Sequence, residues 1–465
     1  MDKYDLIIIG GGPAGYAGAL KAAQYNKKIA IFEKEKIGGV CLNVGCIPTK
    51  ALSAKAGLIE SIRKQTQKGV FKEAGLFSYK KIKREKDGIV SRLTRGVENL
   101  LKMAGVDIIN KEAEIISANE IKAGSKVFKT DYILIATGSN NLSFPSFDNK
   151  KLTYDSTALL DMDTIPSSMV VIGAGVIGLE MASIFNSFGT KITVIELLSE
   201  ILPSFDSDVI KTYKRQLENK GIDFKLDSLV KSINLTKDNK RIVEFANKEG
   251  KEQNVTADVV LCSIGRKPNF SKANANKINL EINENGFVIV NDMMQTNIPN
   301  IFAAGDITGG DLLAHVGIKE AEIAVKNMFS DKKLIFSGNL IPSCVYSYPS
   351  LAKIGLTTKQ AKEKKIGIIE GVYNYIGNGM ALAVEETAGF AKIIVSQESK
   401  KILGGQILGE QAVELIMQLA VMIANEMTVD EWDEKIIVAH PTLSEILHEA
   451  IMDSVSKSIH TPLSK

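Results

Sequence analysis

The sequence predicts an α/β protein with two modules built on parallel sheets, followed by a separate α+β domain. Three observations predict this fold class. Residues 4–34 and residues 168–197 align with a constant offset of 163. Each copy has a β-branched run, a glycine-rich turn, a stretch of helical periodicity and an apolar strand that ends in an acid, which is the pattern of a βαβ unit. After residue 340, short apolar strands precede helices, which is typical of an α+β domain.

Length, charge and the start of the chain limit the function classes. The 465 residues correspond to roughly three domains at about 150 residues each. With 57 basic and 54 acidic residues and no long block of like charge, the chain lacks the electrostatic footprint of nucleic-acid or anionic-membrane binding. No apolar run is long enough to span a bilayer, and the start carries acids where a signal peptide has basic residues. We therefore expect a cytoplasmic protein.

The pattern along the chain predicts several further elements and the domain boundaries. We expect a linker around 140–167, which contains Pro145 and Pro166, and a helix over 312–328. In the last part we expect strands at 372–377, 381–386, 390–396 and 401–409, then a helix over 410–426. The expected domains are a first nucleotide module with the cysteine pair (1–144), a second nucleotide module (145–267), a segment that completes the first module (268–337) and a C-terminal interface domain (338–465).

The two glycine motifs predict two Rossmann-like dinucleotide sites. Gly10, Gly12 and Gly15 align with Gly173, Gly175 and Gly178. In such motifs the first glycine permits a tight turn, the second lets backbone approach a pyrophosphate, and the third allows close packing of helix and strand. Each third glycine is followed 18 residues later by an acid, Glu33 or Glu196, which we expect to accept hydrogen bonds from an adenosine ribose.

The two sites are expected to differ in cofactor. No lysine or arginine lies between residues 192 and 210, and Glu196 would repel a 2′-phosphate, so the second module is expected to prefer NAD over NADP. The first module contains a longer insertion and is the better candidate for a flavin dinucleotide. Further candidate contacts follow apolar strands, at Thr137, Gly138, Gly265 and Asp306.

Two of the four cysteines, Cys41 and Cys46, lie five positions apart. In a reducing compartment such a pair is more typical of catalysis or metal binding than of a structural bridge. A disulfide requires a tight turn between them, which Asn43 and Gly45 permit. A helix that begins near Cys46 would favour its thiolate. Metal binding lacks a second ligand pair at zinc spacing, and an inert buried pair is the remaining alternative. Cys262 and Cys344 stand singly in apolar strands and are expected to be small core residues.

His440 is the candidate general base for thiol chemistry, because a dithiol is mostly protonated at neutral pH. It lies directly before an expected helix start, where Glu445 could hold one ring nitrogen and raise the basicity of the other. The run from Thr442 to Glu445 also fits a capping box, in which Glu445 only satisfies a backbone N–H. The spacing alone does not choose between the two.

The chain also carries GGVCLNVGCIPTK at 38–50, ATG at 136–138, AAGD at 303–306 and HPTLSE at 440–445. With these segments and both glycine motifs, it resembles the flavoprotein disulfide reductases from end to end. The resemblance implies FAD and NAD as cofactors and a homodimer. It implies that Cys41 exchanges with substrate and that Cys46 faces the flavin. Lys50 and Glu180 match an ion pair near the flavin N5, and the helix that starts around Ala314 and His315 would face the flavin pyrimidine. The resemblance also favours the His440–Glu445 dyad, with the histidine supplied by the partner subunit.

The activity that the resemblance implies is oxidation of protein-bound dihydrolipoamide by NAD. The expected partner is the lipoyl domain of an acyltransferase or of a glycine-cleavage H protein, since no lipoyl domain is seen before Met1. The alternatives are an NADPH-dependent reductase of a small disulfide and a redox-silent flavin-binding protein. Two positions depart from the family pattern: Ser350 follows Pro349 where a glutamate is usual, and Val438 stands where relatives often carry a second histidine.

Overall fold

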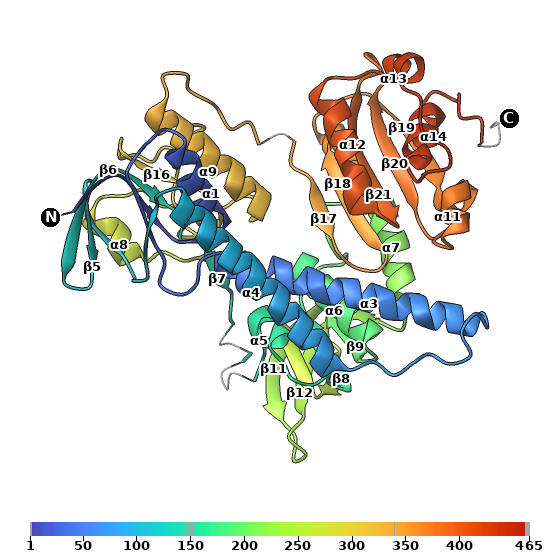
Figure 1. The fold of residues 1–465 in the computed structure, drawn as a ribbon. Helices are drawn as coiled ribbons and strands as arrows, with labels where there is room; N and C mark the ends of the chain where they lie inside the picture. The colour runs from blue at the N-terminus through green and yellow to red at the C-terminus, as the bar shows by residue number, and fades with distance from the viewer. Residues whose placement is uncertain (1, 145–146, 149–151, 339, 461–465) are drawn as a thin grey trace.

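The computed structural model describes residues 2–144, 147–148, 152–338 and 340–460, so Pro145 and the expected boundary beside it lie outside the described residues (Figure 1). The first sheet lies at the N-terminal end of the molecule, the second module lies beside it, and the C-terminal sheet with its helices forms a separate lobe. The long helices α3 and α4 run between these three parts.

The first module is the expected βαβ unit, extended into a seven-stranded sheet. Strands β3, β2, β1 and β6 are parallel neighbours, β16 pairs with β6 in parallel, and β4 and β5 add an antiparallel edge. The pairing of β16 returns the chain to the first sheet after the second module. The bounds are β1 Lys3–Ile9, α1 Pro13–Ala23, β2 Ile29–Phe32, β3 Asp107–Ile109, β4 Glu114–Ser117, β5 Glu120–Ala123, β6 Lys126–Ile135, α8 Lys272–Lys277, β16 Ile301–Ala303, η1 Asp306–Thr308 and α9 Ala314–Phe329.

The second module repeats the first in register. Its parallel sheet has the order β10-β9-β8-β14, and an antiparallel meander of β11, β12 and β13 lies beside it. The helix after each glycine turn starts at residue 13 in one module and at residue 176 in the other, which is the offset of 163. The bounds are β8 Ser168–Ile172, α6 Val176–Ser187, β9 Lys191–Ile195, α7 Ser207–Asn219, β10 Asp223–Lys225, β11 Ser228–Leu235, β12 Arg241–Asn247, β13 Glu252–Ala257 and β14 Val259–Cys262.

The insertion of the first module is helical. A short helix carries Cys41, and the two long helices after it lie across the middle of the molecule (Figure 1). A two-stranded ribbon of β7 and β15 connects the nucleotide modules. The bounds are α2 Gly39–Val44, α3 Cys46–Gln67, α4 Tyr79–Met103, β7 Ser139–Asn141, α5 Ser156–Leu160 and β15 Arg266–Pro268.

The C-terminal part is an antiparallel sheet of order β17-β18-β21-β20-β19 covered by helices, so the α+β prediction is confirmed. One predicted strand is wrong, since residues 381–386 contain the end of a short helix and a turn. The strand expected at 372–377 is correct only to Asn374, because residues 375–377 form a 3-10 helix. The Asn378 side chain accepts a hydrogen bond from the Ala381 N–H and caps that helix. The bounds are β17 Ser343–Val345, β18 Ser350–Gly355, α10 Thr358–Glu363, β19 Ile368–Asn374, η2 Tyr375–Gly377, α11 Gly379–Ala383, β20 Phe390–Ser396, β21 Ile402–Gly409, α12 Ala412–Ala424, α13 Val429–Lys435 and α14 Glu445–Asp453.

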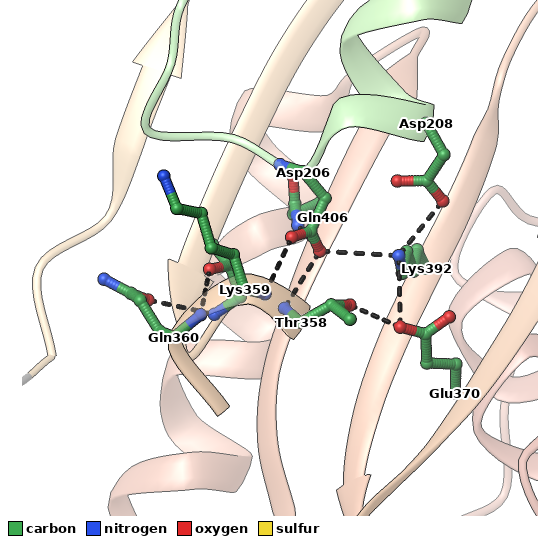
Figure 2. A network of polar contacts seen from close by, with 9 residues as sticks. Asp206, Asp208, Thr358, Lys359, Gln360, Glu370, Lys392 and Gln406 are labelled. Carbon is green, nitrogen blue, oxygen red and sulfur yellow. Dashed lines mark hydrogen bonds and ion pairs between the residues drawn. The ribbon is translucent and has the colours of Figure 1, made fainter. Parts of the chain in front are cut away.

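One apolar cluster contains residues from all three parts, besides the clusters that lie within each part. Leu52 of α3, Phe185 of α6 and Leu351 of β18 belong to the same buried cluster. A buried polar network joins the second module to the C-terminal sheet beside this core (Figure 2). Because burying an unpaired charge is costly, such a network holds the two parts in one arrangement. Across the described ranges, no helix combines the length and the apolar character needed to cross a membrane.

Candidate functional site

The first glycine turn has the geometry that its motif predicts. Gly10 has a φ of +105°, and an added Cβ would lie 2.2 Å from the Ala136 carbonyl oxygen. At Gly15 an added Cβ would lie 1.8 Å from the Gly10 carbonyl oxygen, so only glycine lets helix α1 pack this closely. At Gly12 the nearest atom would be 4.0 Å away, which leaves the N-terminal end of α1 open for a ligand.

The second turn repeats this pattern. Gly173 has a φ of +97°, an added Cβ on Gly178 would lie 2.2 Å from the Gly173 carbonyl oxygen, and one on Gly175 would meet nothing within 4 Å. Gly265 also has a positive φ, of +134°, at the turn after β14. Both modules therefore combine a strained turn and a close contact with an open middle position, which is the arrangement that admits a pyrophosphate.

The two acids lie beside their glycine turns and bind them. Glu33 accepts a hydrogen bond from the Gly11 N–H (2.7 Å) with one oxygen and from the Glu35 N–H (2.7 Å) with the other. Glu196 accepts equivalent bonds from the N–H groups of Ala174 (2.6 Å) and Leu198 (2.8 Å). A carboxylate has about four acceptor positions, so both acids can still accept from a ribose.

The fold brings one lysine, Lys225, next to Glu196, although it lies outside the segment after β9 in which the sequence shows no lysine or arginine. Lys225 lies on the neighbouring strand β10, where its carbonyl accepts from the Glu196 N–H (2.9 Å). Its ammonium pairs with Asp223 at 3.1 Å.

A cavity of 2200 Å³ extends from the first glycine turn to the cysteines. The residues around it fit a flavin dinucleotide, because two groups there lack a protein neighbour. Thr137 Oγ1 is buried without a hydrogen-bond partner, and a Cβ on Gly138 would meet nothing within 4 Å. A bound polar ligand would satisfy the Thr137 hydroxyl. Many of the predicted site residues line this cavity: Gly10, Gly12, Glu33, Cys41, Cys46, Lys50, Thr137, Gly138, Glu180, Asp306, Ala314 and His315.

Asp306 lies at one side of this cavity in a polar cluster that the sequence analysis did not find. Its carboxylate accepts a hydrogen bond from the Ser139 hydroxyl and lies 3.7 Å from Arg266. Arg266 also donates to the Ser139 hydroxyl (2.7 Å) and to the Asn141 side chain (2.6 Å). The ribbon between the modules thus fixes the orientation of Asp306. The arginine follows Gly265 directly, but nothing in that pattern indicates its partners.

The cysteines lie at the junction of two helices rather than on a tight turn. Cys41 is in α2, Gly45 breaks the helix, and Cys46 begins α3 as expected. Asn43 is not a turn residue: its amide donates to the carbonyls of Ile37 (3.0 Å) and Gly39 (2.9 Å). Its side-chain oxygen accepts from the Thr94 hydroxyl of α4 at 3.1 Å. These bonds hold α2 against α4.

Both thiols are free in the structure and interact with each other. The hydrogen bond from the Cys41 thiol lowers the pKa of Cys46 to about 7, and the Lys50 ammonium contributes in the same direction. The same interaction, together with burial, raises the pKa of Cys41. Cys46 is therefore the thiol of the pair that ionises first, which makes it the better electron donor to a neighbouring acceptor.

Lys50 and Glu180 come together from α3 and α6. The Lys50 Nζ lies 3.1 and 2.9 Å from the two oxygens of Glu180, whose side chain is buried. The backbone N–H of Tyr346 donates to Glu180 at 2.9 Å. The carboxylate thus holds the ammonium one helical turn beyond Cys46.

Helix α9 begins at Ala314, and both Ala314 and His315 line the cavity. The His315 ring nitrogen Nε2 is 3.0 Å from the Pro342 carbonyl oxygen. The N-terminal N–H groups of α9 thus lie at the cavity wall, where a helix dipole favours negative charge.

His440 and Glu445 form the expected contact, and the capping alternative is also partly present. Glu445 Oε1 is 2.9 Å from His440 Nδ1, and Oε2 accepts from the Thr442 N–H at 2.9 Å. Burial opposes ionisation of Glu445, but these two bonds outweigh it and lower its pKa. The carboxylate orients the ring so that Nε2 faces away from it.

Within one chain, the structure does not place His440 at the cysteines. The His440 side chain is 77% exposed and is absent from the residues that line the cavity within the described ranges. The two remaining cysteines differ from each other. Cys262 is buried in β14 as expected, whereas Cys344 is only half-buried: it packs against the C-terminal core as expected and also lines the cavity.

A fold with two dinucleotide turns that lie on either side of a dithiol and an ion pair defines a class of oxidoreductases that move electrons between a nucleotide and a disulfide. The sequence profile of the pyridine nucleotide-disulphide oxidoreductases matches residues 4–327, and the profile of their dimerisation domain matches residues 341–451. The chain belongs to this family. Membership implies FAD and NAD(H) as cofactors, and the second match supports a homodimer.

Curated relatives are similar over nearly the whole length. Dihydrolipoyl dehydrogenase of Geobacillus stearothermophilus is 35% identical over 460 residues, which cover 98% of this chain and 97% of that protein. The mitochondrial dihydrolipoyl dehydrogenase of Pisum sativum is 36% identical over 468 residues, covering 99% and 93%. These matches make the chain an oxidoreductase of this type.

Solved structures share the fold. The HOCl-induced flavoprotein disulfide reductase RclA of Escherichia coli has a TM-score of 0.87 at 25% identity, covering 96% of this chain and 99% of its own. LpdA of Mycobacterium tuberculosis has a TM-score of 0.88 at 25% identity, covering 97% and 99%.

Proposed function

We propose that this chain oxidises protein-bound dihydrolipoamide to lipoamide with NAD as the final acceptor. The observation that carries the proposal is the position of Cys46: it begins α3 beside Cys41 and Lys50, on the wall of the cavity to which the first glycine turn opens. The names of the full-length relatives support the choice of substrate.

The thiol steps follow from the two helices and the dyad. His440 Nε2 takes a proton from one substrate thiol, and the resulting thiolate attacks Cys41 Sγ of the Cys41–Cys46 disulfide. The S–S bond breaks, and Cys46 leaves as a thiolate that Lys50 and the N-terminal end of α3 stabilise. The second substrate thiol then loses its proton to solvent, and its thiolate attacks the substrate sulfur bound to Cys41, which closes the lipoyl disulfide and releases Cys41, to which His440 returns the first proton. Two electrons thus pass from the dithiol to the cysteine pair.

FAD, when bound, would supply the redox chemistry that connects the cysteine pair to NAD. In this proposal the first glycine turn, Glu33, Thr137, Asp306, Ala314 and His315 would hold that group. The second glycine turn and Glu196 hold NAD. Lys50 and Glu180 keep a fixed charge pair between the two sites.

We also propose that His440 acts on the cysteines of the partner subunit. Its exposure and its absence from the cavity support this arrangement, as does the exposed face of α12, where Met417 and Val421 are 50% and 60% exposed. The test mixes two inactive homodimers, His440→Gln and Cys41→Ser. Across subunits, the mixed dimer has one complete site, so reassociation restores about a quarter of wild-type activity. If the residues act within one chain, no activity returns.

The proposed partner is the lipoyl domain of an acyltransferase or a glycine-cleavage H protein, met in the cytoplasm. The activity test compares dihydrolipoamide with NAD against glutathione disulfide with NADPH on one preparation. We expect turnover with the first pair only. The opposite result would identify an NADPH-dependent reductase, and flavin-loaded protein that is inactive with both pairs would indicate a redox-silent protein.

A further inference from the structure

A short segment of the C-terminal part connects the two helices that carry the ion pair. Tyr346, the first residue after β17, donates its backbone N–H to Glu180 of α6 (2.9 Å) and accepts from the Ser53 hydroxyl of α3 (2.9 Å) with its carbonyl oxygen. Two residues later, the Tyr348 N–H donates to the Ser183 hydroxyl at 3.0 Å. Ser53 and Ser183 each lie three residues after a member of the ion pair, on the same helix face.

The ring of Tyr346 lies against the lysine of that pair. Lys50 Nζ is 4.3 Å from the ring centroid and contacts both oxygens of Glu180. The Lys50 side chain is 32% exposed, so solvent is an available alternative for its ammonium. A cation over an aromatic face is attracted to it, more strongly where water is partly excluded. The ring therefore restricts the positions that the flexible Lys50 side chain can adopt.

We propose that Tyr346 is a positioning residue: its ring holds the Lys50 ammonium at Glu180 and near Cys46, so that a residue of the C-terminal part sets the thiolate population of the redox pair. The proposal rests on the proposed function only in assigning Cys46 as the thiolate. The hydroxyl plays no part in it. A phenylalanine would serve equally, whereas an aliphatic side chain would not, because only a π face attracts the cation.

The test compares Tyr346→Leu with Tyr346→Phe. In reduced holoenzyme, the thiolate fraction of Cys46 is measured against pH by its alkylation rate with iodoacetamide, with the modified site assigned by mass spectrometry. We expect the leucine variant to contain about two- to fivefold less thiolate at pH 7, the range expected for a cation–π contact. The phenylalanine variant should match the wild type. No shift in the leucine variant, or an equal shift in both, overturns the proposal.

Tyr348 provides the matched control. It lies in the same segment, and the lysine over its ring is Lys220, at 4.4 Å from the ring centroid, whereas Lys50 lies over the ring of Tyr346. Tyr348→Leu should leave the Cys46 titration unchanged, whereas an equal shift would show that any loosening of the segment has this effect and would overturn the proposal. Flavin content and thermal unfolding confirm that each variant is folded. Since alkylation needs no lipoyl substrate, an error in the proposed substrate would not alter this result.

Discussion

The two nucleotide modules share their turn, their helix and even the hydrogen bonds of their acids, but they differ in the segment that comes after the acid. After Glu33 the chain enters α2 and α3 and delivers the cysteines to the first turn, so that Gly39 lies opposite Gly12. After Glu196 it enters a loop that the C-terminal sheet holds: Lys353 donates to the Ser204 carbonyl at 2.6 Å. The difference shows that a duplicated scaffold can specialise through the segment after a repeated strand, without changing the turn itself.

The loop after Glu196 ends at the buried residue Asp206, which Gln406 and Lys392 of the C-terminal sheet hold in place. The Asp206 N–H donates to Gln406 Oε1 at 3.0 Å, and the Asp206 carboxylate accepts from the Gln406 amide (Figure 2). Lys392, which is 3% exposed, lies 3.4 Å from Asp206, 3.0 Å from Asp208 and 3.3 Å from Glu370. Burial opposes the charge of Lys392, but these carboxylates outweigh it and raise its pKa.

The largest expected effect is loss of thiol chemistry from the first module alone. Cys46→Ser should abolish oxidation of dihydrolipoamide, because serine cannot complete the disulfide. Reduction of ferricyanide by NADH should persist, since it needs only the two nucleotide sites. The control is Cys262→Ser in the second module, which should retain both activities. Loss of both activities in Cys46→Ser would mean that electron transfer between the two nucleotide sites also depends on the cysteine pair.

The next effect tests the support of the second loop. Lys392→Met leaves Asp206 buried without its cation and should lower the free energy of unfolding by about 3–5 kcal/mol. Denaturant unfolding measures this change. Asp208→Asn removes a partner that is 55% exposed and should cost less than about 1 kcal/mol. Equal losses in the two variants would contradict the role assigned to burial.

A smaller effect sharpens the comparison of the two turns. Gly175→Ala meets no protein atom, so the variant should fold normally and retain its flavin. The methyl group occupies space that the nucleotide needs and should raise the KM for NAD by about tenfold, equivalent to about 1.4 kcal/mol. Gly178→Ala instead clashes with the Gly173 carbonyl and should destabilise the fold by about 1–3 kcal/mol. An unchanged KM in Gly175→Ala would place the pyrophosphate elsewhere.

The smallest effect is a displaced titration. Because the pKa of Cys46 is lowered to about 7, its thiolate predominates above pH 7 and is lost as the pH falls below it. Lys50→Met removes a cation that favours the thiolate, so the midpoint should rise by about one unit. The pH dependence of Cys46 alkylation measures both midpoints. A midpoint that stays at 7 would show that the thiol pair sets it without the lysine.

Local patterns predicted much of the fold. The repeat predicted both βαβ units. The start of α3 at Cys46 and both ends of the strand at 390–396 also agree with the structure. The strand expected at 381–386 failed because the alternation Ala-Leu-Ala-Val resembles a period of two, while a tertiary contact decides the outcome. The Asn378 amide, which caps the helix, also donates to the Thr442 carbonyl, far away in the sequence.

The candidate site was predictable where motif and chemistry coincide and not where distant segments meet. The cysteines, the glycines and the His440–Glu445 contact could be named in advance. Tyr346 contacts Glu180 and Ser53, which both lie more than 100 positions away in the sequence. Arg266 contacts Asp306, which belongs to a different element of the fold. No spacing within one segment indicates such contacts.

The bonds from each glycine turn to its own acid have a consequence for coenzyme engineering. Glu196 holds the N–H groups of Ala174 and Leu198 before any nucleotide arrives, so the pocket is organised in advance and binding orders fewer atoms. Replacing Glu196 by a neutral or basic residue to admit a phosphorylated ribose would also leave two backbone donors without their acceptor. A successful switch therefore needs a second substitution that restores an acceptor for the turn.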